Sequence, residues 1–346
     1  IAWLPQRLIG IMANDTLLAV PFFTFMGLIL ERSGMAEDLL DTVGQVFGPI
    51  RGGLALAVIF VGALLAATTG VVAASVISMG LISLPIMLRY GYDRSLSSGV
   101  IAASGTLAQI IPPSLVLILM ADQLGRSVGE MYKGAFIPGF MLMGLYVVPQ
   151  TAHRARPAAR GAHLPRGQRP LRLPVTGGGD GALIPPLLLI FLVLGTIFLG
   201  IATPTEGGAM GAMAALVIGF ARGRLNMKLL QQALASTTKL ASFVMFIMVG
   251  ATTFSMIFQA ADGPKWVEHL MASLPGGQVG FLIVVNIMIF FLAFFLDYFE
   301  LSFIVVPLLG PVAEKMGIDL IWFGVLLAMN MQTSFMHPPF GFALFF

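Results

Sequence analysis

SGTLAQIIPPS, residues 104–114, places two adjacent prolines inside an apolar segment that would otherwise form one continuous helix. Proline removes a backbone donor and breaks helices, so the chain must interrupt its helix here. Five positions share an offset of 226 residues with a second copy: Pro85, Gly91, Asp93, Pro112 and Pro113 match Pro311, Gly317, Asp319, Pro338 and Pro339. Two apolar halves, each with a broken helix at the same place, predict a secondary transporter built from repeats.

The composition predicts an all-α polytopic membrane protein. Of 346 residues, 58% are hydrophobic and 10% are charged, and the mean hydropathy is +0.94. A soluble domain of this length could not bury so much apolar surface. Cysteine is absent and the four histidines form no ligand pair at helical spacing, so we expect no disulfide, metal centre or cofactor. The net charge of +3 gives no nucleic-acid signal, and the expected partner surface is the lipid bilayer.

Each half is expected to contain a helical hairpin followed by a helix broken at Pro-Pro. Residues 52–88 carry no charge, and a single helix of that length would be about 55 Å long. The hydrocarbon core is only roughly 30 Å thick, so the chain must turn, and Thr68-Thr69-Gly70 supplies polar, flexible residues near the middle. The expected regions are a first repeat at 1–148 (hairpin 52–88, broken helix 97–122) and a second at 182–346 (hairpin 277–314, broken helix 320–346).

The distribution of lysine and arginine predicts that the two repeats are inverted. If the first hairpin enters from the cytoplasm, most basic residues fall on the cytoplasmic side, as the positive-inside rule requires. The second hairpin then enters from the opposite face. The chain starts at Ile1 and stops at Phe346 within an apolar run, so we expect a protein that is incomplete at both ends.

The loop 149–181 contains six arginines and five prolines and separates the repeats. One interpretation is a patch that binds anionic lipid or has a regulatory role. The other is a disordered basic linker, or reading-frame damage in a GC-rich gene, because the low-complexity composition offers no packed role. Both interpretations stay open at the level of sequence.

Four places at membrane depth are expected to leave the helical conformation: 66–71, 104–114, 295–300 and 330–340. Such backbone survives in a membrane only where it is buried or lines a cavity. Carbonyls freed by proline, together with hydroxyl and amide oxygens, are uncharged ligands that suit Na⁺ at half-helix ends. The natural partners of the breaks are the hairpin tips, which carry Thr68, Thr69 and Gly70 in the first repeat and Asp297 in the second.

The hairpin tips also favour an anionic substrate, because backbone N–H groups and helix N-termini attract negative charge. The candidate substrate-binding residues are Thr69, Gly70, Gln109, Ser114, Asp297 and His337. Several of these have a second interpretation. Asp297 and Glu300 are ionisable groups at hydrophobic depth, which are usually functional, but at a hydrated tip they would only gate or solubilise. His337 would be a proton or substrate group, or a satisfied polar residue, and Ser75, Ser78 and Ser83 would bond their own backbone.

Together these residues resemble one family, the large membrane subunit (DctM type) of tripartite ATP-independent periplasmic, or TRAP, transporters. The similarity covers nearly everything except 149–181. The segments that carry it are NDTLLAVPFFTFMGLILERSGM (14–35), SGTLAQIIPPS (104–114), IATPTEGGAMG (201–211), FLDYFEL (295–301) and NMQTSFMHPPFGFALFF (330–346). The resemblance implies an elevator-type, Na⁺-coupled importer of small organic acids in the bacterial inner membrane. Its expected partners are a small DctQ-type membrane subunit and a periplasmic DctP-type binding protein, and it is not an enzyme.

The resemblance also implies two Na⁺ sites, each formed by a hairpin and a broken helix. The residues implied for the first site are Thr68, Thr69, Ser104, Gly105, Thr106 and Pro112. Those implied for the second are Asp297, Asn330, Gln332, Thr333 and Pro338. Two rival functions remain: a stand-alone Na⁺/dicarboxylate symporter, which would need SNT-like signatures, and an intramembrane enzyme using Asp297 or Glu300, which would need a GxGD or zinc motif. The sequence has no SNT string and no zinc motif, and its GxGD string, GGGD at 177–180, lies in the basic loop and not at Asp297 or Glu300.

Overall fold

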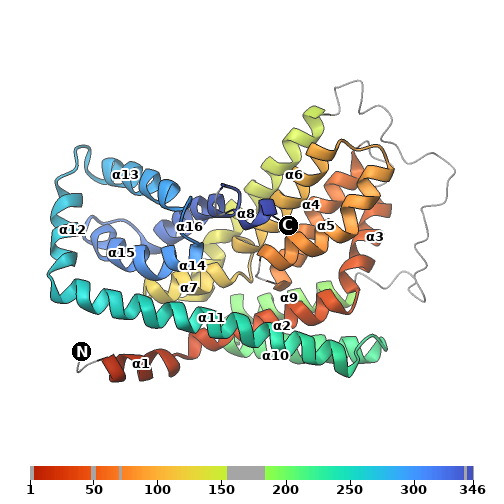
Figure 1. Ribbon diagram of the computed structural model, residues 1–346, viewed down its shortest axis with the longest axis horizontal. Helices are drawn as coiled ribbons and strands as arrows, with labels where there is room; N and C mark the ends of the chain where they lie inside the picture. Colours follow the sequence, from red (N-terminus) through yellow and green to blue (C-terminus); the bar gives the residue numbers. More distant parts are fainter. Residues whose placement is uncertain (1–3, 48–51, 70–71, 154–183, 339–340, 346) are drawn as a thin grey trace.

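Helices account for every regular element that the structure, a computed structural model, describes (Figure 1). It describes residues 4–47, 52–69, 72–153, 184–338 and 341–345. The all-α membrane fold expected from the sequence is therefore confirmed. Most of the basic loop 149–181 lies outside these residues, as does Gly70 at the tip of the first hairpin.

A peripheral layer runs along one side of the molecule (Figure 1, bottom). It consists of α1 (Leu4–Met12), η1 (Asp15–Leu18), α2 (Ala19–Arg32), α9 (Ile184–Phe198), α10 (Pro204–Ala221) and α11 (Met227–Ala260). Helix α2 packs on α10 and α11. Small residues allow this approach: a Cβ on Gly208 would lie 3.1 Å from Cβ of Phe22. The glycines of the IATPTEGGAMG segment thus serve helix packing, which in membranes depends on small residues.

Two units of hairpin and broken helix lie above this layer (Figure 1). The first comprises α3 (Met35–Phe47), α4 (Gly53–Thr69), α5 (Val72–Arg89), α6 (Arg94–Thr106), η2 (Leu107–Gln109), α7 (Leu115–Gln123) and α8 (Val128–His153). The second comprises α12 (Gly263–Ala272), α13 (Gly277–Leu292), α14 (Tyr298–Glu300), the π-helical turn η4 (Leu301–Val305), α15 (Val306–Lys315), α16 (Leu320–Met331), η5 (Gln332–Phe335) and α17 (Phe342–Phe345). The hairpins are α4 with α5, and α13 with the α14–α15 segment.

The repeated Gly-x-Asp pattern marks where each hairpin ends and each broken helix begins. Gly91 and Gly317 both have a φ of +77°, the left-handed conformation that ends a helix readily only at glycine. Two residues later an aspartate caps the next helix. Asp93 accepts a hydrogen bond from Leu96 N (3.1 Å), and Asp319 accepts one from Trp322 N (2.7 Å). The repeated residues are thus the turn between hairpin and broken helix.

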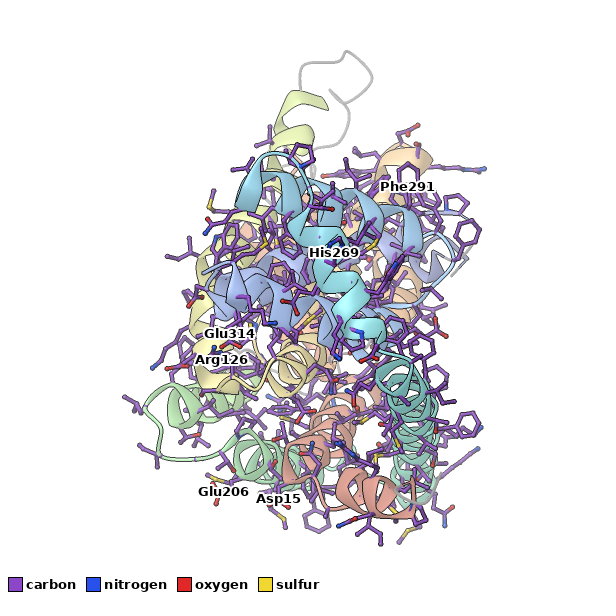
Figure 2. The ribbon with its side chains drawn as sticks, turned by 90° about the vertical axis from the view of Figure 1, so that its left-hand side faces the viewer. Asp15, Arg126, Glu206, His269, Phe291 and Glu314 are labelled. Carbon is purple, nitrogen blue, oxygen red and sulfur yellow. The ribbon has the colours of Figure 1, made fainter. Side chains whose placement is uncertain are left out.

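Each broken helix spans both units. Helix α6 packs on α4 and α5 of its own hairpin, whereas α7, beyond the Pro-Pro break, packs on η4, α15 and α16 of the second unit. The ion pair Arg126–Glu314 (2.7 Å) joins the end of this segment to α15 (Figure 2). In the second broken helix, α16 packs on α13 of its own hairpin and on α7 and α8 of the first unit, and α17 packs on α5 and α6. Both breaks therefore lie at the boundary between the units.

Long apolar helices are a minority among the described residues. Val128–Val148 and Met227–Ala260 are each long and apolar enough to cross a membrane, and the pair Pro5–Met12 with Asp15–Arg32, bent by 48°, is a third candidate. The shorter apolar helices include the first arm of each hairpin, Gly53–Leu65 and Gly277–Leu292. Short helices of this kind are what the hairpin and break interpretation requires, since each traverses only part of the roughly 30 Å core.

Candidate functional site

The first break lies against its own hairpin with almost no space between the backbones. A Cβ on Gly62 of α4 would lie 2.6 Å from Cβ of Ser104, and a Cβ on Gly105 would lie 3.2 Å from the backbone N of Val76 in α5. Real Cβ atoms do not make the first contact. Gly62 and Gly105 are therefore the residues that let α6 sit between the two hairpin arms.

Ser104, Gly105 and Thr106 were expected outside the helix, and that expectation was wrong: they form the last turn of α6. Their hydroxyls explain why. Ser104 donates to the Ile101 carbonyl (3.0 Å) and Thr106 to the Ala103 carbonyl (2.8 Å), so both side chains fit a helical turn. Thr106 also shares a hydrogen bond with Tyr146 of α8. Each hydroxyl oxygen keeps lone-pair capacity in a fully buried position.

The non-helical part of the first break runs from Ile110 to Ser114. Ser114 donates to the Gln109 carbonyl (2.5 Å) and accepts from Leu117 N (3.3 Å), so it closes the break and caps α7. Pro112 lies within this closed segment. The Gln109 side chain is 3% exposed, and its Oε1 has no hydrogen-bond partner in the described part of the chain. An amide oxygen without a partner is a candidate ligand for a cation or a donor group.

The second break also contacts its hairpin, but through different chemistry. Asn330, 226 residues after Ser104, donates to the carbonyl (2.8 Å) and the side-chain oxygen (2.9 Å) of Asn286 in α13. Met331, which matches Gly105, meets the Ser302 hydroxyl through its sulfur (3.9 Å). Ser302 in turn matches Val76. Asn330 and Met331 were also expected to be non-helical and instead end α16, because Asn330 is held by the neighbouring arm.

The 3₁₀ turn η5 contains the polar residues of the second break. Thr333 donates to the Asn330 carbonyl (2.7 Å), which repeats the Thr106 arrangement one residue further along. Gln332 is 2% exposed, and neither its Oε1 nor its Nε2 has a partner among the described residues. A buried primary amide with four unused hydrogen-bonding positions is unfavourable unless something binds there.

Asp297 lies at the tip of the second hairpin, where it is the N-cap residue of α14. Its carboxylate accepts from Phe299 N (2.7 Å), and Glu300 accepts from Asp297 N (3.0 Å), which forms a capping box. Asp297 is 7% exposed, whereas Glu300 is only partly buried. Both residues thus have a structural role at the tip, and Asp297 is a buried carboxylate there.

His337 contacts two phenylalanine rings next to the second Pro-Pro. Its ring lies parallel to Phe294 (centroids 4.5 Å apart) and perpendicular to Phe290 (4.8 Å). Its Nδ1 is buried without a partner in the described residues. Pro338 follows and is exposed. His337 therefore packs against α13 and the segment after it, on the hairpin side of the break.

Two serine hydroxyls of the first hairpin donate hydrogen bonds to different kinds of acceptor. Ser83 donates to the Met79 carbonyl in its own helix, as expected. Ser78 was expected to do the same, and this was wrong: it donates to the Glu31 carboxylate of α2, because that face of α5 meets the peripheral layer. The side chains of Thr68 and Thr69, at the end of α4, lie outside the described residues, so their assigned roles stay predictions.

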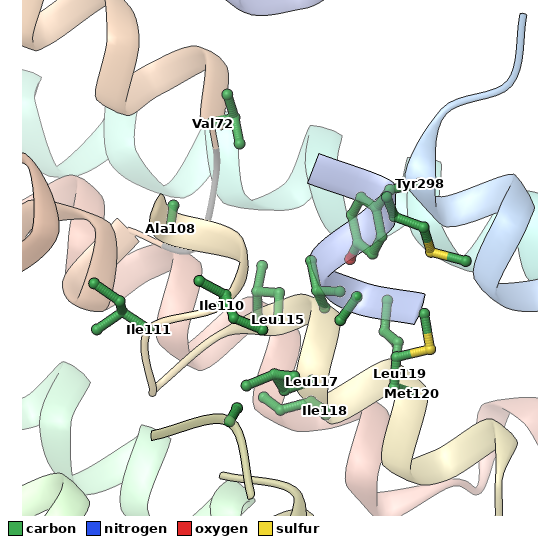
Figure 3. Packing of buried hydrophobic residues seen from close by; sticks show 14 of the residues in the cluster. Val72, Ala108, Ile110, Ile111, Leu115, Leu117, Ile118, Leu119, Met120 and Tyr298 are labelled. Atoms are coloured by element: carbon green, nitrogen blue, oxygen red, sulfur yellow. The ribbon is translucent and has the colours of Figure 1, made fainter. Parts of the chain in front are cut away.

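Tyr298 is a buried polar residue that sequence reasoning did not select. It begins α14 beside Asp297, is 2% exposed, and its hydroxyl has no partner in the described chain. It lies in the apolar cluster with Ile110 and Leu115 of the first break (Figure 3). From the sequence alone, Tyr298 is one of several aromatic residues of the second hairpin. Its hydroxyl becomes a candidate functional group only because the structure buries it near the first break.

Two hairpins and two broken helices that meet at one boundary define a membrane transport protein of the secondary-transporter class. Within the described chain, no group of three or more His, Cys, Asp or Glu residues could hold a metal ion. The polar groups described at the breaks and hairpin tips are hydroxyls and amides, with Asp297, Glu300 and His337 in the second unit.

Comparisons with known proteins give the family. The family model for the DctM component of tripartite ATP-independent periplasmic transporters matches residues 2–346, so the chain belongs to this family. The C4-dicarboxylate TRAP transporter large permease protein DctM of Rhodobacter capsulatus is 31% identical over 95% of this chain and 77% of its own length. The protein of the same name in Pseudomonas aeruginosa is 32% identical, covering 95% and 76%. These relatives are transport permeases, so the chain is a permease subunit and not an enzyme.

A solved structure agrees with the fold. The crystal structure of the Alcanivorax borkumensis YdaH transporter, described as having an unusual topology, matches with a TM-score of 0.67. The match covers 99% of this chain and 80% of that one at 15% identity. At this identity the likeness concerns the fold alone.

Proposed function

We propose that this chain is the Na⁺-coupled permease of an importer for small organic acids in the bacterial inner membrane. A periplasmic DctP-type protein would deliver the substrate, and a small DctQ-type subunit would complete the membrane part. The two units would act as inverted repeats that carry the substrate by an elevator movement. The family and the relatives named for C4-dicarboxylates support this proposal.

The observation that carries the proposal is the position of both breaks at the boundary between the two units. Each break ends a half-helix, so its carbonyls point toward that boundary, and uncharged oxygens lie beside them. Discontinuous helices of this kind bind Na⁺ with their C-terminal carbonyls in secondary transporters. We assign one Na⁺ to the first hairpin and break, with the Ser104 and Thr106 oxygens, and another to Asp297 with Asn330, Gln332 and Thr333.

The second site is the stronger of the two because it contains a carboxylate. Asp297 brings a formal negative charge to the cation, whereas the first break offers only neutral oxygens. The Asp297 carboxylate accepts a backbone hydrogen bond from Phe299, and its further acceptor capacity would serve to coordinate the ion. Binding of Na⁺ there would also neutralise Asp297 at membrane depth, where an isolated charge is costly.

Asp297→Asn tests the second site with the fold preserved. Asparagine caps helices as well as aspartate does, so α14 and membrane insertion should be retained while the charge is lost. In proteoliposomes containing the permease with its small subunit and binding protein, Na⁺-driven uptake should be abolished. Ser83→Ala, which removes a hydroxyl bonded within its own helix, is the control and should transport normally.

Uptake by Asp297→Asn at the rate and Na⁺ dependence of the parent protein would contradict the second site. The first site has its own test, because Thr69→Ala combined with Thr106→Ala should raise the Na⁺ concentration that gives half-maximal uptake. Uptake without the binding protein would instead favour the stand-alone symporter.

A further inference from the structure

Two equally buried tyrosines differ in the state of their hydroxyl groups. Tyr132 is fully buried, and its hydroxyl donates to the Ser114 carbonyl (3.4 Å). Tyr298 is 2% exposed, and its hydroxyl has no partner in the described part of the chain. A buried hydroxyl without a hydrogen bond is destabilising. Val72, which matches Tyr298 in the first unit, is as buried and has no such group, so the fold does not require a hydroxyl here.

Tyr298 and Gln332 lie on two segments that pack against each other. The Tyr298 ring contacts Phe335 (centroids 6.1 Å apart), and Ser302, one helical turn along, contacts Met331. Phe335 and Gln332 are three residues apart in η5, and side chains at that spacing are eclipsed in a 3₁₀ helix. Gln332 therefore leaves η5 on the side that faces the second hairpin arm, as Phe335 does.

The backbone at this place is also unusual. The π-helical turn η4 follows directly after Tyr298-Phe299-Glu300, whereas the matching arm of the first unit, α5, is α-helical throughout. Single π-turns are rare and are frequently found at functional sites. Two buried polar side chains without partners, beside such a turn, indicate a place built to receive a ligand group.

We propose that the Tyr298 hydroxyl and the Gln332 amide N–H group both donate hydrogen bonds to one carboxylate of the transported acid. This rests on the proposed function. A carboxylate accepts several hydrogen bonds, and bonds to an ionised group are roughly twice as strong as neutral ones. The Gln332 Oε1 is left for Na⁺, so one side chain contacts both cargo and ion.

The neighbouring carboxylate explains why binding should depend on Na⁺. Asp297 precedes Tyr298, and two carboxylates near each other repel unless a cation lies between them. Na⁺ at Asp297 must therefore bind before, or together with, the acid. Loss of the Tyr298 hydroxyl should weaken binding of the transported acid. It should leave the binding of Na⁺ in the absence of acid unchanged.

The test compares Tyr298→Phe with the matched control Tyr132→Phe in the purified complex of permease and small subunit. The melting temperature is titrated at saturating Na⁺ with succinate, pyruvate or N-acetylneuraminate, three carboxylates of different size. A ligand that binds only the folded protein raises the melting temperature according to its dissociation constant. Tyr298→Phe should raise the apparent dissociation constant of the stabilising acid about tenfold, and Tyr132→Phe should leave it unchanged.

The melting temperatures without acid give a second readout. Tyr298→Phe should melt no lower than the parent, whereas Tyr132→Phe should melt lower because it loses a made hydrogen bond. The rise in melting temperature caused by NaCl relative to choline chloride should be equal in Tyr298→Phe and the parent.

Several outcomes would overturn the proposal. An unchanged dissociation constant in Tyr298→Phe contradicts the hydrogen bond to the acid while the proposed function stands. A lower melting temperature without acid shows a structural role for the hydroxyl instead. If none of the three acids stabilises the parent protein at saturating Na⁺, the proposed carboxylate cargo is wrong, and this inference falls with it.

Discussion

The two units of hairpin and broken helix use one scaffold with opposite packing chemistry. In the first, glycines close the space, with Gly62 against Ser104 and Gly105 against Val76. In the second, the residues that match Ser104 and Gly105 make polar contacts: Asn330 bonds to Asn286, and Met331 meets Ser302. The first break is thus a tightly packed joint with satisfied hydroxyls. The second unit contains the Asp297 carboxylate and the Gln332 amide, whose side-chain atoms have no partner among the described residues, and we propose it as the stronger ion site.

The largest effect on stability is expected when Gly105 and Met331, which occupy matched positions in the two units, are exchanged. Gly105→Met places a side chain against the Val76 backbone, which cannot move aside, so we expect more than about 3 kcal/mol of destabilisation and loss of folded protein. The reverse change, Met331→Gly, leaves a cavity and should cost about 3–5 kcal/mol. Fluorescence-detected size-exclusion chromatography of each variant measures this. A monodisperse Gly105→Met would contradict the packing described for the first unit.

A smaller effect separates the hydrogen bonds of the two breaks. Asn330→Ala removes two bonds to the neighbouring arm and should lower stability by about 1–3 kcal/mol. Ser104→Ala, at the matched position, removes a bond within its own helix and should change stability by less than about 1 kcal/mol. Thermal unfolding of both variants in detergent decides the order. Equal losses would show that the hydroxyl of Ser104 also supports contact between elements.

The smallest effect concerns the contact between the units. Arg126 and Glu314 form an exposed ion pair between the end of α7 and α15. Pairs of this kind contribute about 0–1 kcal/mol, so Arg126→Ala should leave the melting temperature nearly unchanged. Uptake by Arg126→Ala should also stay normal, since α7 is held to the second unit by buried contacts. A large loss of either would mean that the pair, and not the apolar packing, joins the units.

Local chemistry could be predicted from the sequence where it depends on a few neighbouring residues. The sequence shows Gly91 with Asp93, and Gly317 with Asp319, as repeated positions, and the structure shows that each pair forms a turn and a helix cap. The extent of each break was harder. The prolines indicate where a helix must stop, but Ser104 and Thr106 remain helical because their hydroxyls find carbonyls three residues back.

What depends on tertiary packing could not be read from the chain. Nothing in the sequence shows that α7 joins the second unit and α17 the first, because that exchange is set by contacts far apart in sequence. The state of the Tyr298 hydroxyl is of the same kind. A tyrosine in an apolar hairpin is unremarkable until the residues that surround it are known.

The sodium-dependent stability of two matched variants tests most directly whether the second break is the stronger ion site. Gln332→Leu and Thr106→Val remove polar atoms at positions 226 residues apart without a large change in volume. The quantity to measure is the rise in melting temperature when NaCl replaces choline chloride. We predict that Gln332→Leu loses most of this rise and that Thr106→Val keeps most of it. A full rise in Gln332→Leu, together with its loss in Thr106→Val, would contradict the assignment.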